Sequence, residues 1–306
     1  MRLIVAALVG ACAVFTGVPS ALADKVAQQA GGEAPSSDVP DVPGENIFGF
    51  TDPTDVGKPG DTGLASENTG RAGKRIGRYF TLQSKTELGR TLDENTWGAV
   101  SLFNSYYRVR DVPDLDRNLN RTAFDGLSFE IARRIVERSA TNPFAVTVSL
   151  EPRWSRLDAT AGTRVEAYSA EAKLFIDAVV VPEKLFWAMN LNYAPGTQRG
   201  MEPGAKWEDS AGTSVSTALT YAWSPTVFTG GEVRVLSAFN RAFFGRYAGS
   251  ALFIGPTFLW KITDKVAFNA VWTPQVAGRA QSNRDRLLDL DNFERHQFRA
   301  KLAVQF

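Results

Sequence analysis

The sequence is nearly devoid of cysteine and histidine. Its 306 residues include one cysteine, Cys12, and one histidine, His296. One cysteine cannot form an intrachain disulfide, and the chain shows no cluster of zinc ligands. It also lacks a nucleophile elbow, a phosphate-binding glycine loop and the hydroxyl-and-histidine pattern of outer-membrane phospholipases. These absences argue against an enzyme, and no cofactor or metal is predicted.

Long apolar runs are missing everywhere except at the N-terminus. Arg2 is followed by an apolar run over residues 3–14, a Gly-Val-Pro break and the sequence Ala-Leu-Ala before Asp24. This pattern predicts a Sec signal peptide over residues 1–23, cleaved after Ala23, so that Cys12 leaves with it. A lipobox ending at Cys12 is the alternative, but it leaves only a stub of apolar sequence before the cysteine. Residues 24–44 carry few large apolar side chains and are predicted to be a disordered periplasmic leader.

Charge of either sign is not in excess, because the formal net charge is +1. Nucleic acid is therefore not an expected partner. Hydrophobic residues nevertheless make up 44% of the chain, while no later apolar run approaches the roughly 18 residues of a spanning helix. A β-barrel is then the remaining way to cross a membrane, since lipid does not accept open sheet edges.

The C-terminal residues carry the clearest pattern that is present. Residues 296–306 place an apolar side chain at most even positions, with Arg299, Lys301 and Gln305 between them, and end on Phe306. Period two ending on an aromatic residue is typical of the closing strand of an outer-membrane barrel. An edge strand of a soluble sandwich is the alternative. Phe306 is the predicted assembly signal for the barrel-assembly machinery.

Similar alternation recurs along the chain, in segments separated by links of two kinds. The clearest alternating segments are residues 144–151, 164–180, 185–193, 215–223, 227–239 and 268–273. Short links near residues 92–95, 139–142, 181–183, 224–225 and 263–264 alternate with longer ones at 109–121, 157–162, 196–209, 240–247 and 277–291. Bacterial barrels have short periplasmic turns and longer outer loops. The sequence therefore predicts an all-β, up-and-down antiparallel transmembrane β-barrel of about twelve strands over residues 45–306.

An even number of strands requires one more strand before residue 78. Residues 45–51 are the only candidate, followed by a predicted outer loop from residue 52 to about 73. This first strand is expected to pair with the last one and close the barrel.

The phase of each strand predicts which charged side chains face the lumen. The lumen-lining set is Lys85, Glu87, Glu130, Arg134, Glu151, Arg153, Glu171, Lys173, Glu232, Arg234, Arg295, Arg299 and Lys301. Such charges either leave a wetted path for solutes or pair with one another and seal the lumen. Glu151 with Arg153, and Glu232 with Arg234, are expected to be neighbours on one strand. Arg295, Arg299 and Lys301 share a phase with no acidic residue of their own strand, which predicts that they attract anions.

Two other groups were considered for chemistry. The oxygen-rich run of Asp289, Asp291, Asn292 and Glu294 has ligands that Ca²⁺ accepts, but a solvated charged rim is the favoured interpretation. The same holds for Asp111, Asp114 and Asp116. His296 falls on the lipid-side phase of the last strand, where a structural role is favoured over a catalytic one.

Four short strings are shared with a known kind of protein. They are residues 45–51 (ENIFGFT), 182–186 (PEKLF), 255–257 (GPT) and 292–296 (NFERH). Through them the chain resembles uncharacterised proteobacterial outer-membrane β-barrels of the transporter-like type, including the putative MetA-pathway of phenol degradation family. The resemblance implies a barrel and the passage of solutes.

The prediction from sequence is an exported outer-membrane channel of a Gram-negative bacterium for passive or weakly selective passage of small solutes. Its expected partners are outer-membrane lipid and lipopolysaccharide, the barrel-assembly machinery and small solutes. A sealed barrel with a structural or surface-interaction role is the alternative, followed by a membrane-embedded lipid-modifying enzyme.

Overall fold

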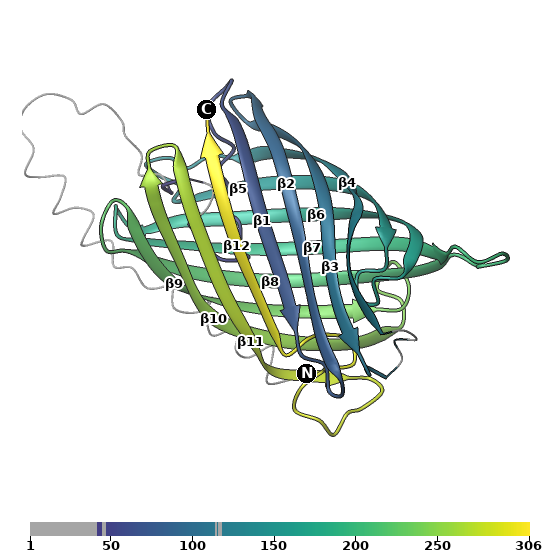
Figure 1. Ribbon diagram of the computed structural model, residues 1–306. Coiled ribbons are helices and arrows are strands. Elements are labelled where there is room, and N and C mark those ends of the chain that lie inside the picture. Colours follow the sequence, from purple (N-terminus) through teal and green to yellow (C-terminus); the bar gives the residue numbers. More distant parts are fainter. Residues whose placement is uncertain (1–41, 45–46, 114, 116–117) are drawn as a thin grey trace, which may run out of the picture. The chain divides into compact units, whose positions relative to one another are not determined.

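The computed structural model describes residues 42–44, 47–113, 115 and 118–306. The predicted signal peptide and the predicted leader up to residue 41 lie outside the described residues, as do Asp114 and Asp116. Within the described residues, antiparallel strands form a closed barrel in which each strand pairs with its neighbours in sequence (Figure 1). The strands are β1 Thr62–Ala72, β2 Arg78–Asp93, β3 Thr96–Arg110, β4 Leu119–Val136, β5 Phe144–Leu157, β6 Arg164–Val181, β7 Leu185–Gly200, β8 Glu208–Ala222, β9 Val227–Phe239, β10 Tyr247–Thr263, β11 Val266–Ala280 and β12 His296–Gln305. The predicted twelve-stranded up-and-down barrel is confirmed.

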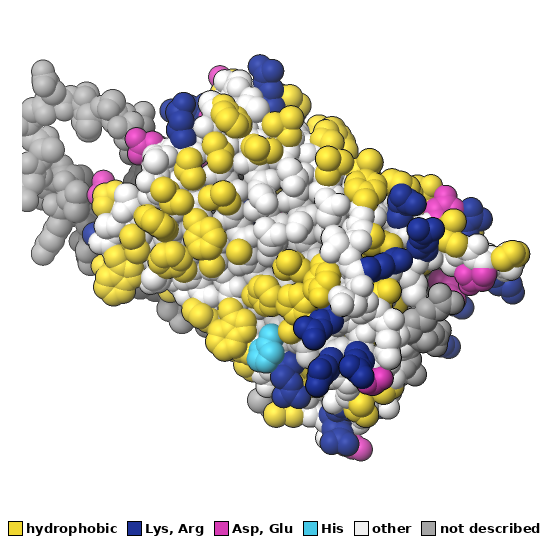
Figure 2. Space-filling view, viewed as in Figure 1, with side chains coloured by type: hydrophobic (Ala, Val, Ile, Leu, Met, Phe, Trp, Pro, Cys, Tyr) yellow, Lys and Arg dark blue, Asp and Glu magenta, His cyan; other side chains and the backbone are white. Residues whose placement is uncertain are grey.

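The strands form because their side chains alternate between two environments. On β3, Ser101 and Ser105 point inward and are buried, whereas Val100 and Leu102 are 54% and 49% exposed on the outer face. A protein in water would place these side chains the other way round. Apolar side chains also cover much of the outer face in Figure 2. This inverted arrangement suits a barrel that is surrounded by hydrocarbon. No helix in the described part of the chain has the length and apolar character to cross a bilayer.

The links at one end of the barrel are mostly shorter than those at the other, as predicted, with the 137–143 link as the exception. At one end of the barrel the short links are residues 94–95, 137–143, 182–184, 223–226 and 264–265. At the other end are residues 73–77, 111–118, 158–163, 201–207, 240–246 and 281–295. We call the second end the outer end, because barrels of this kind carry their longer loops outside the cell.

The prediction for the first strand was wrong. The strand that pairs with β12 is β1, with Gly63 opposite Gln305 and Ala72 opposite His296. Residues 47–51 belong to no strand, and the predicted outer loop from residue 52 to about 73 is also wrong because β1 occupies its second half. β1 has Leu64 as its only large apolar side chain, so its alternation is invisible in the sequence. Its Gly70 instead lies under the ring of Phe298 on β12, where a Cβ atom would be 1.9 Å from the ring.

Candidate functional site

Residues 47–56, which we call the inner segment, lie in the lumen near the end with the short links. Ile47 and Phe48 are each 1% exposed and pack with Phe186 and Phe228 at the starts of β7 and β9. The apolar sequence that resembled a membrane strand therefore contacts the inside of the barrel. Burial of two large apolar side chains favours this position by about 3–6 kcal/mol.

Buried polar side chains of the barrel hold the backbone of the inner segment. The Thr51 amide donates to Glu232 at 2.9 Å, and the Thr54 amide donates to Asp177 at 2.7 Å. The Asn269 side-chain amide donates to the Phe48 carbonyl at 2.6 Å. A segment without strand partners must find such acceptors and donors, because unpaired buried backbone groups are costly.

Arg299 of β12 joins the inner segment to the barrel. Its guanidinium donates to the Gly49 carbonyl and forms ion pairs with Asp52 at 3.8 Å and with Glu67 of β1 at 3.3 Å. Gly49 itself has no room for a side chain, since a Cβ atom would lie 2.5 Å from a Glu232 oxygen and 2.7 Å from Thr257. The segment is thus fitted closely to this side of the lumen.

A cavity of about 590 Å³ lies between the inner segment and the outer end of the lumen. Phe50, Asp52 and Pro53 of the inner segment line it on one side, and Phe293 of the 281–295 link lines it toward the outer end. Most of the remaining lining residues are inward side chains of the strands, and many are charged. A cavity of this size holds a small solute with its water.

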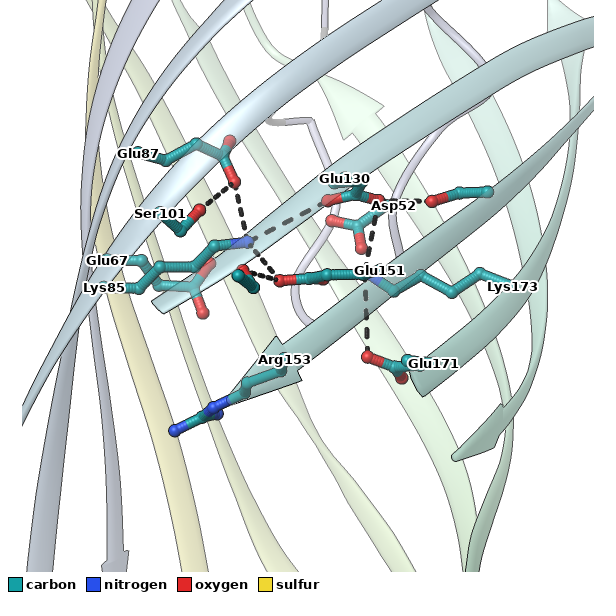
Figure 3. Close-up of polar contacts among 12 residues, drawn as sticks. Asp52, Glu67, Lys85, Glu87, Ser101, Glu130, Glu151, Arg153, Glu171 and Lys173 are labelled. Atoms are coloured by element: carbon teal, nitrogen blue, oxygen red, sulfur yellow. Dashed lines mark hydrogen bonds and ion pairs between the residues drawn. The ribbon is translucent and has the colours of Figure 1, made fainter. Parts of the chain in front are cut away.

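One side of the cavity carries a network of lysines and glutamates. We call it the lysine–glutamate cluster, and its members are Lys85, Glu87, Glu130, Glu151, Glu171 and Lys173 (Figure 3). Lys85 contacts Glu87 at 2.6 Å and Glu151 at 3.4 Å, and Lys173 contacts Glu151 at 2.7 Å. All six residues belong to β2, β4, β5 and β6. The cluster is therefore satisfied within the barrel wall and needs nothing from the inner segment.

The other side of the cavity is richer in arginine. Arg234 pairs with Glu232 at 3.5 Å and lies 3.7 Å above the Phe50 ring. Arg71 and Lys301 also line the cavity, and no ion pair is found for either within the described residues. β12 itself supplies no acidic partner for Arg299 or Lys301, as predicted, but β1 brings Glu67 within 3.3 Å of Arg299 and directly opposite Lys301 in the register.

The structure places most of the predicted lumen-lining residues at the cavity. All of them except Arg134, Glu232 and Arg295 are among its lining residues. Arg134 binds the 94–95 link at the barrel end, and Glu232 lies under the inner segment. Arg295 precedes β12 and is exposed.

The expected neighbours along single strands meet only in part. Glu232 and Arg234 do form an ion pair. Arg153 instead pairs with Asp125 of β4 at 2.8 Å, while Glu151 contacts the two lysines. The inward phase predicted for Glu151 and Arg153 was therefore right, whereas their ion-pair partners lie on other strands.

Several functional residues were missed from the sequence. Asp177 shares the inward phase of Glu171 and Lys173, so the same reasoning could have found it. Asp125 could not have been found, because the register between β3 and β4 shifts beside it and reverses the phase of the outer part of β4. Glu67 and Arg71 lie on the unrecognised β1.

The other sequence candidates are His296, Phe306 and the acidic residues of the outer loops. Among the described residues, no group of three or more histidine, cysteine or acidic side chains is placed to hold a metal ion. His296 stacks on Trp272 with ring centroids 5.9 Å apart, on β12 and β11. Phe306 is exposed, and its amide donates to the Thr62 carbonyl.

The fold is similar to that of solved outer-membrane proteins. The COG4313 outer membrane channel from Pseudomonas putida F1 is 10% identical, with a TM-score of 0.53 over 83% of this chain and 98% of that one. The NanC porin is 9% identical, with a TM-score of 0.45 over 79% of this chain and 98% of that one. At 10% identity the likeness to the COG4313 channel shows the barrel fold alone. No curated protein matches the sequence.

The sequence itself matches one described family. The match spans residues 40–306, which include the inner segment and all strands of the barrel. The chain belongs to the family of unknown function DUF6662.

Proposed function

We propose that the protein is a channel of the Gram-negative outer membrane for small polar solutes, and that the inner segment closes it toward the periplasm. The observation that carries the proposal is the cavity of about 590 Å³, lined by charges and bounded by the inner segment. Charged side chains around a water-accessible lumen are what channels use to select solutes.

The contacts of the inner segment support a closure that can be released. They consist of a small apolar anchor and a set of hydrogen bonds to side chains, and the described inner segment has no strand ladder with the barrel. A segment held in this way leaves without unfolding the barrel, because the ladder from β1 to β12 stays intact. The refolded chain is expected to conduct in brief openings.

A disulfide lock tests the proposal. The hydroxyls of Thr51 and Ser216 are 2.9 Å apart, and the mature chain is expected to have no cysteine. In planar bilayers, Thr51→Cys/Ser216→Cys should conduct after reduction and become silent after oxidation. The matched control is Ser216→Cys alone, which should conduct in both states. Silence of the wild-type protein, and of a variant that lacks residues 42–56 but is folded, would refute the channel.

The second candidate is a sealed barrel with a structural role. It is favoured by the same buried hydrogen bonds of the inner segment to Glu232 and Asp177, which fill part of the lumen. This candidate predicts that neither the reduced Thr51→Cys/Ser216→Cys variant nor the variant that lacks residues 42–56 conducts.

A further inference from the structure

The outer end of the barrel carries exposed arginines on the outer face of neighbouring strands. We call them the outer-rim arginines, and they are Arg78, Arg108, Arg110, Arg156 and Arg164. They lie on β2, β3, β5 and β6 at the ends of these strands that adjoin the longer links. Figure 2 shows Lys and Arg side chains gathered toward this end of the barrel.

Two of these arginines lie directly opposite each other on neighbouring strands. Arg78 and Arg110 are direct partners across β2 and β3, and Arg108 is opposite Phe80 two pairs further along, at the next position on the same face. Like charges placed directly opposite destabilise a sheet. The adjacent acid, Asp111, contacts Arg110 at 3.4 Å, but both side chains are more than two-thirds exposed. A bound anion relieves such repulsion.

The depth of the cluster identifies the kind of anion. Phe80 contacts Tyr106 and Phe298 with ring centroids 6.1 Å away. These rings lie on the outer face, and Phe80 is two residue pairs, Tyr106 four pairs, closer to the middle of the barrel than Arg78 and Arg110. Aromatic side chains mark the boundary between hydrocarbon and head groups. The arginines are therefore at the level of lipid head groups in the leaflet that faces outward.

A groove in the barrel wall continues the cluster. β4 pairs with β5 only from Gly126 onward, so residues 119–125 have no partner in β5 in the described ladder. A cavity of about 430 Å³ opens there and is lined by Arg121, Arg156 and Arg164 together with Phe124, Trp154 and Met201.

The groove has an apolar part and a basic part, which together suit an amphiphilic ligand. Its apolar part includes the Phe124 and Trp154 rings, 6.4 Å apart. In its basic part, Arg121 donates one bond to the Gly162 carbonyl at 2.7 Å, while its buried Nε has no hydrogen-bond partner in the structure. Glu166, the acid of the groove, is engaged by Arg199 at 2.9 Å.

We propose that the outer-rim arginines and this groove bind lipid A, with the arginines on its phosphate groups and the apolar part of the groove against its acyl chains. Lipid A is the lipid that presents phosphates at the outer leaflet, and guanidinium groups bind phosphate with paired, charge-assisted hydrogen bonds. This site is separate from the lumen, so it stands whether or not the barrel conducts.

Binding of purified diphosphoryl lipid A to the refolded chain in detergent, followed by calorimetry, tests the proposal. Arg156→Gln/Arg164→Gln and Arg78→Gln/Arg110→Gln should each weaken binding about 100-fold, since each removes two charge-assisted contacts. The matched control is Arg90→Gln/Arg133→Gln, which removes two exposed arginines near the short-link end and should bind like the wild type. Heat-modifiable migration on gels checks that each variant is folded.

Two further ligands decide the source of the phosphate. Lipid A stripped of its phosphates should bind at least tenfold more weakly than the diphosphoryl form. Phosphatidylglycerol in the same micelles should also bind more weakly, because it offers one phosphodiester. Unchanged binding by both arginine variants, or equal binding of phosphatidylglycerol and lipid A, would overturn the proposal.

Discussion

The two sides of the cavity differ in the groups that contact their buried charged side chains. In the lysine–glutamate cluster, each lysine has several carboxylates from its own and other strands of the wall, such as Lys173 with Glu130, Glu151 and Glu171. On the opposite side, Glu232 and Arg299 complete their contacts with backbone groups of the inner segment. The ion pairs of the first arrangement involve no residue of the inner segment, whereas the second arrangement depends on it. The charges of the lysine–glutamate cluster therefore stabilise the barrel wall, whereas Glu232 and Arg299 bind the inner segment.

The largest test of this contrast compares two glutamates. Glu232→Ala leaves Arg234 buried without its ion-pair partner and removes the acceptor of the Thr51 amide, which should cost about 3 kcal/mol or more. We expect a higher open probability in planar bilayers and faster proteolysis within residues 47–61. Glu171→Ala is the control, because Lys173 keeps two other carboxylates. Equal effects of the two changes would remove the distinction between the sides.

Adding a methyl group at Gly49 tests the close fit of the inner segment to the barrel wall. Gly49→Ala forces a Cβ atom against Glu232, Thr257 and Val271, and overpacking of this kind costs about 1–3 kcal/mol. The segment should be displaced and the conductance should rise about tenfold. Gly212→Ala also adds a methyl group in the lumen, but the nearest atom there is 4.0 Å away. A rise in conductance with Gly212→Ala alone would contradict the fit that we describe.

Charge selectivity should depend on Lys301 more simply than on Arg299. Lys301 lines the cavity without an ion pair within the described residues, so Lys301→Gln should shift the reversal potential toward cations in a salt gradient. Arg299→Gln should mainly raise the open probability, because Arg299 binds the Gly49 carbonyl. The outward Arg90→Gln serves as the control for both. An unchanged reversal potential in Lys301→Gln would mean that permeating ions do not pass this side of the cavity.

The smallest expected effect concerns the 281–295 link. Burial raises the pKa of Asp289, and hydrogen bonds from Asn292 oppose that rise only in part. A carboxyl with a raised pKa in the folded state favours the ordered link at low pH, and this contribution is lost as the pH rises through the raised pKa. Asp289→Asn should therefore increase the protection of residues 281–295 against hydrogen exchange near neutral pH, and should do so less at pH 4. Greater protection of the wild-type link at neutral pH would contradict this sign.

Much of the barrel could be predicted because lipid imposes a simple rule on the strands. Alternation on segments such as β5 and β7, together with the sorting of links by length, gives the strand number, the meander and most of the inward charges. The same rule failed at β1, whose side chains are small and polar. It also failed at Ile47 and Phe48, because an apolar pair that contacts lipid and one that contacts Phe186 have the same sequence pattern.

The partners of the inward charges could not be predicted to the same degree. Phase fixes the face of a side chain, whereas the register between strands fixes its neighbour. The register shift beside Asp125 illustrates this limit, since it moves that carboxylate into contact with Arg153. The contacts of Arg299 depend on β1 and on the inner segment, neither of which the alternation reveals.

The direct connection of the inner segment to β1 has a consequence for biogenesis. The pairing of β1 with β12 joins residues as far apart as Gly63 and Gln305, so it requires the largest loop closure of any strand pair and is expected to form last. The inner segment is tethered to one of the two strands of that seam. We expect it to enter the lumen while the seam is still open, so that its contacts with the barrel wall form together with the last strand pair.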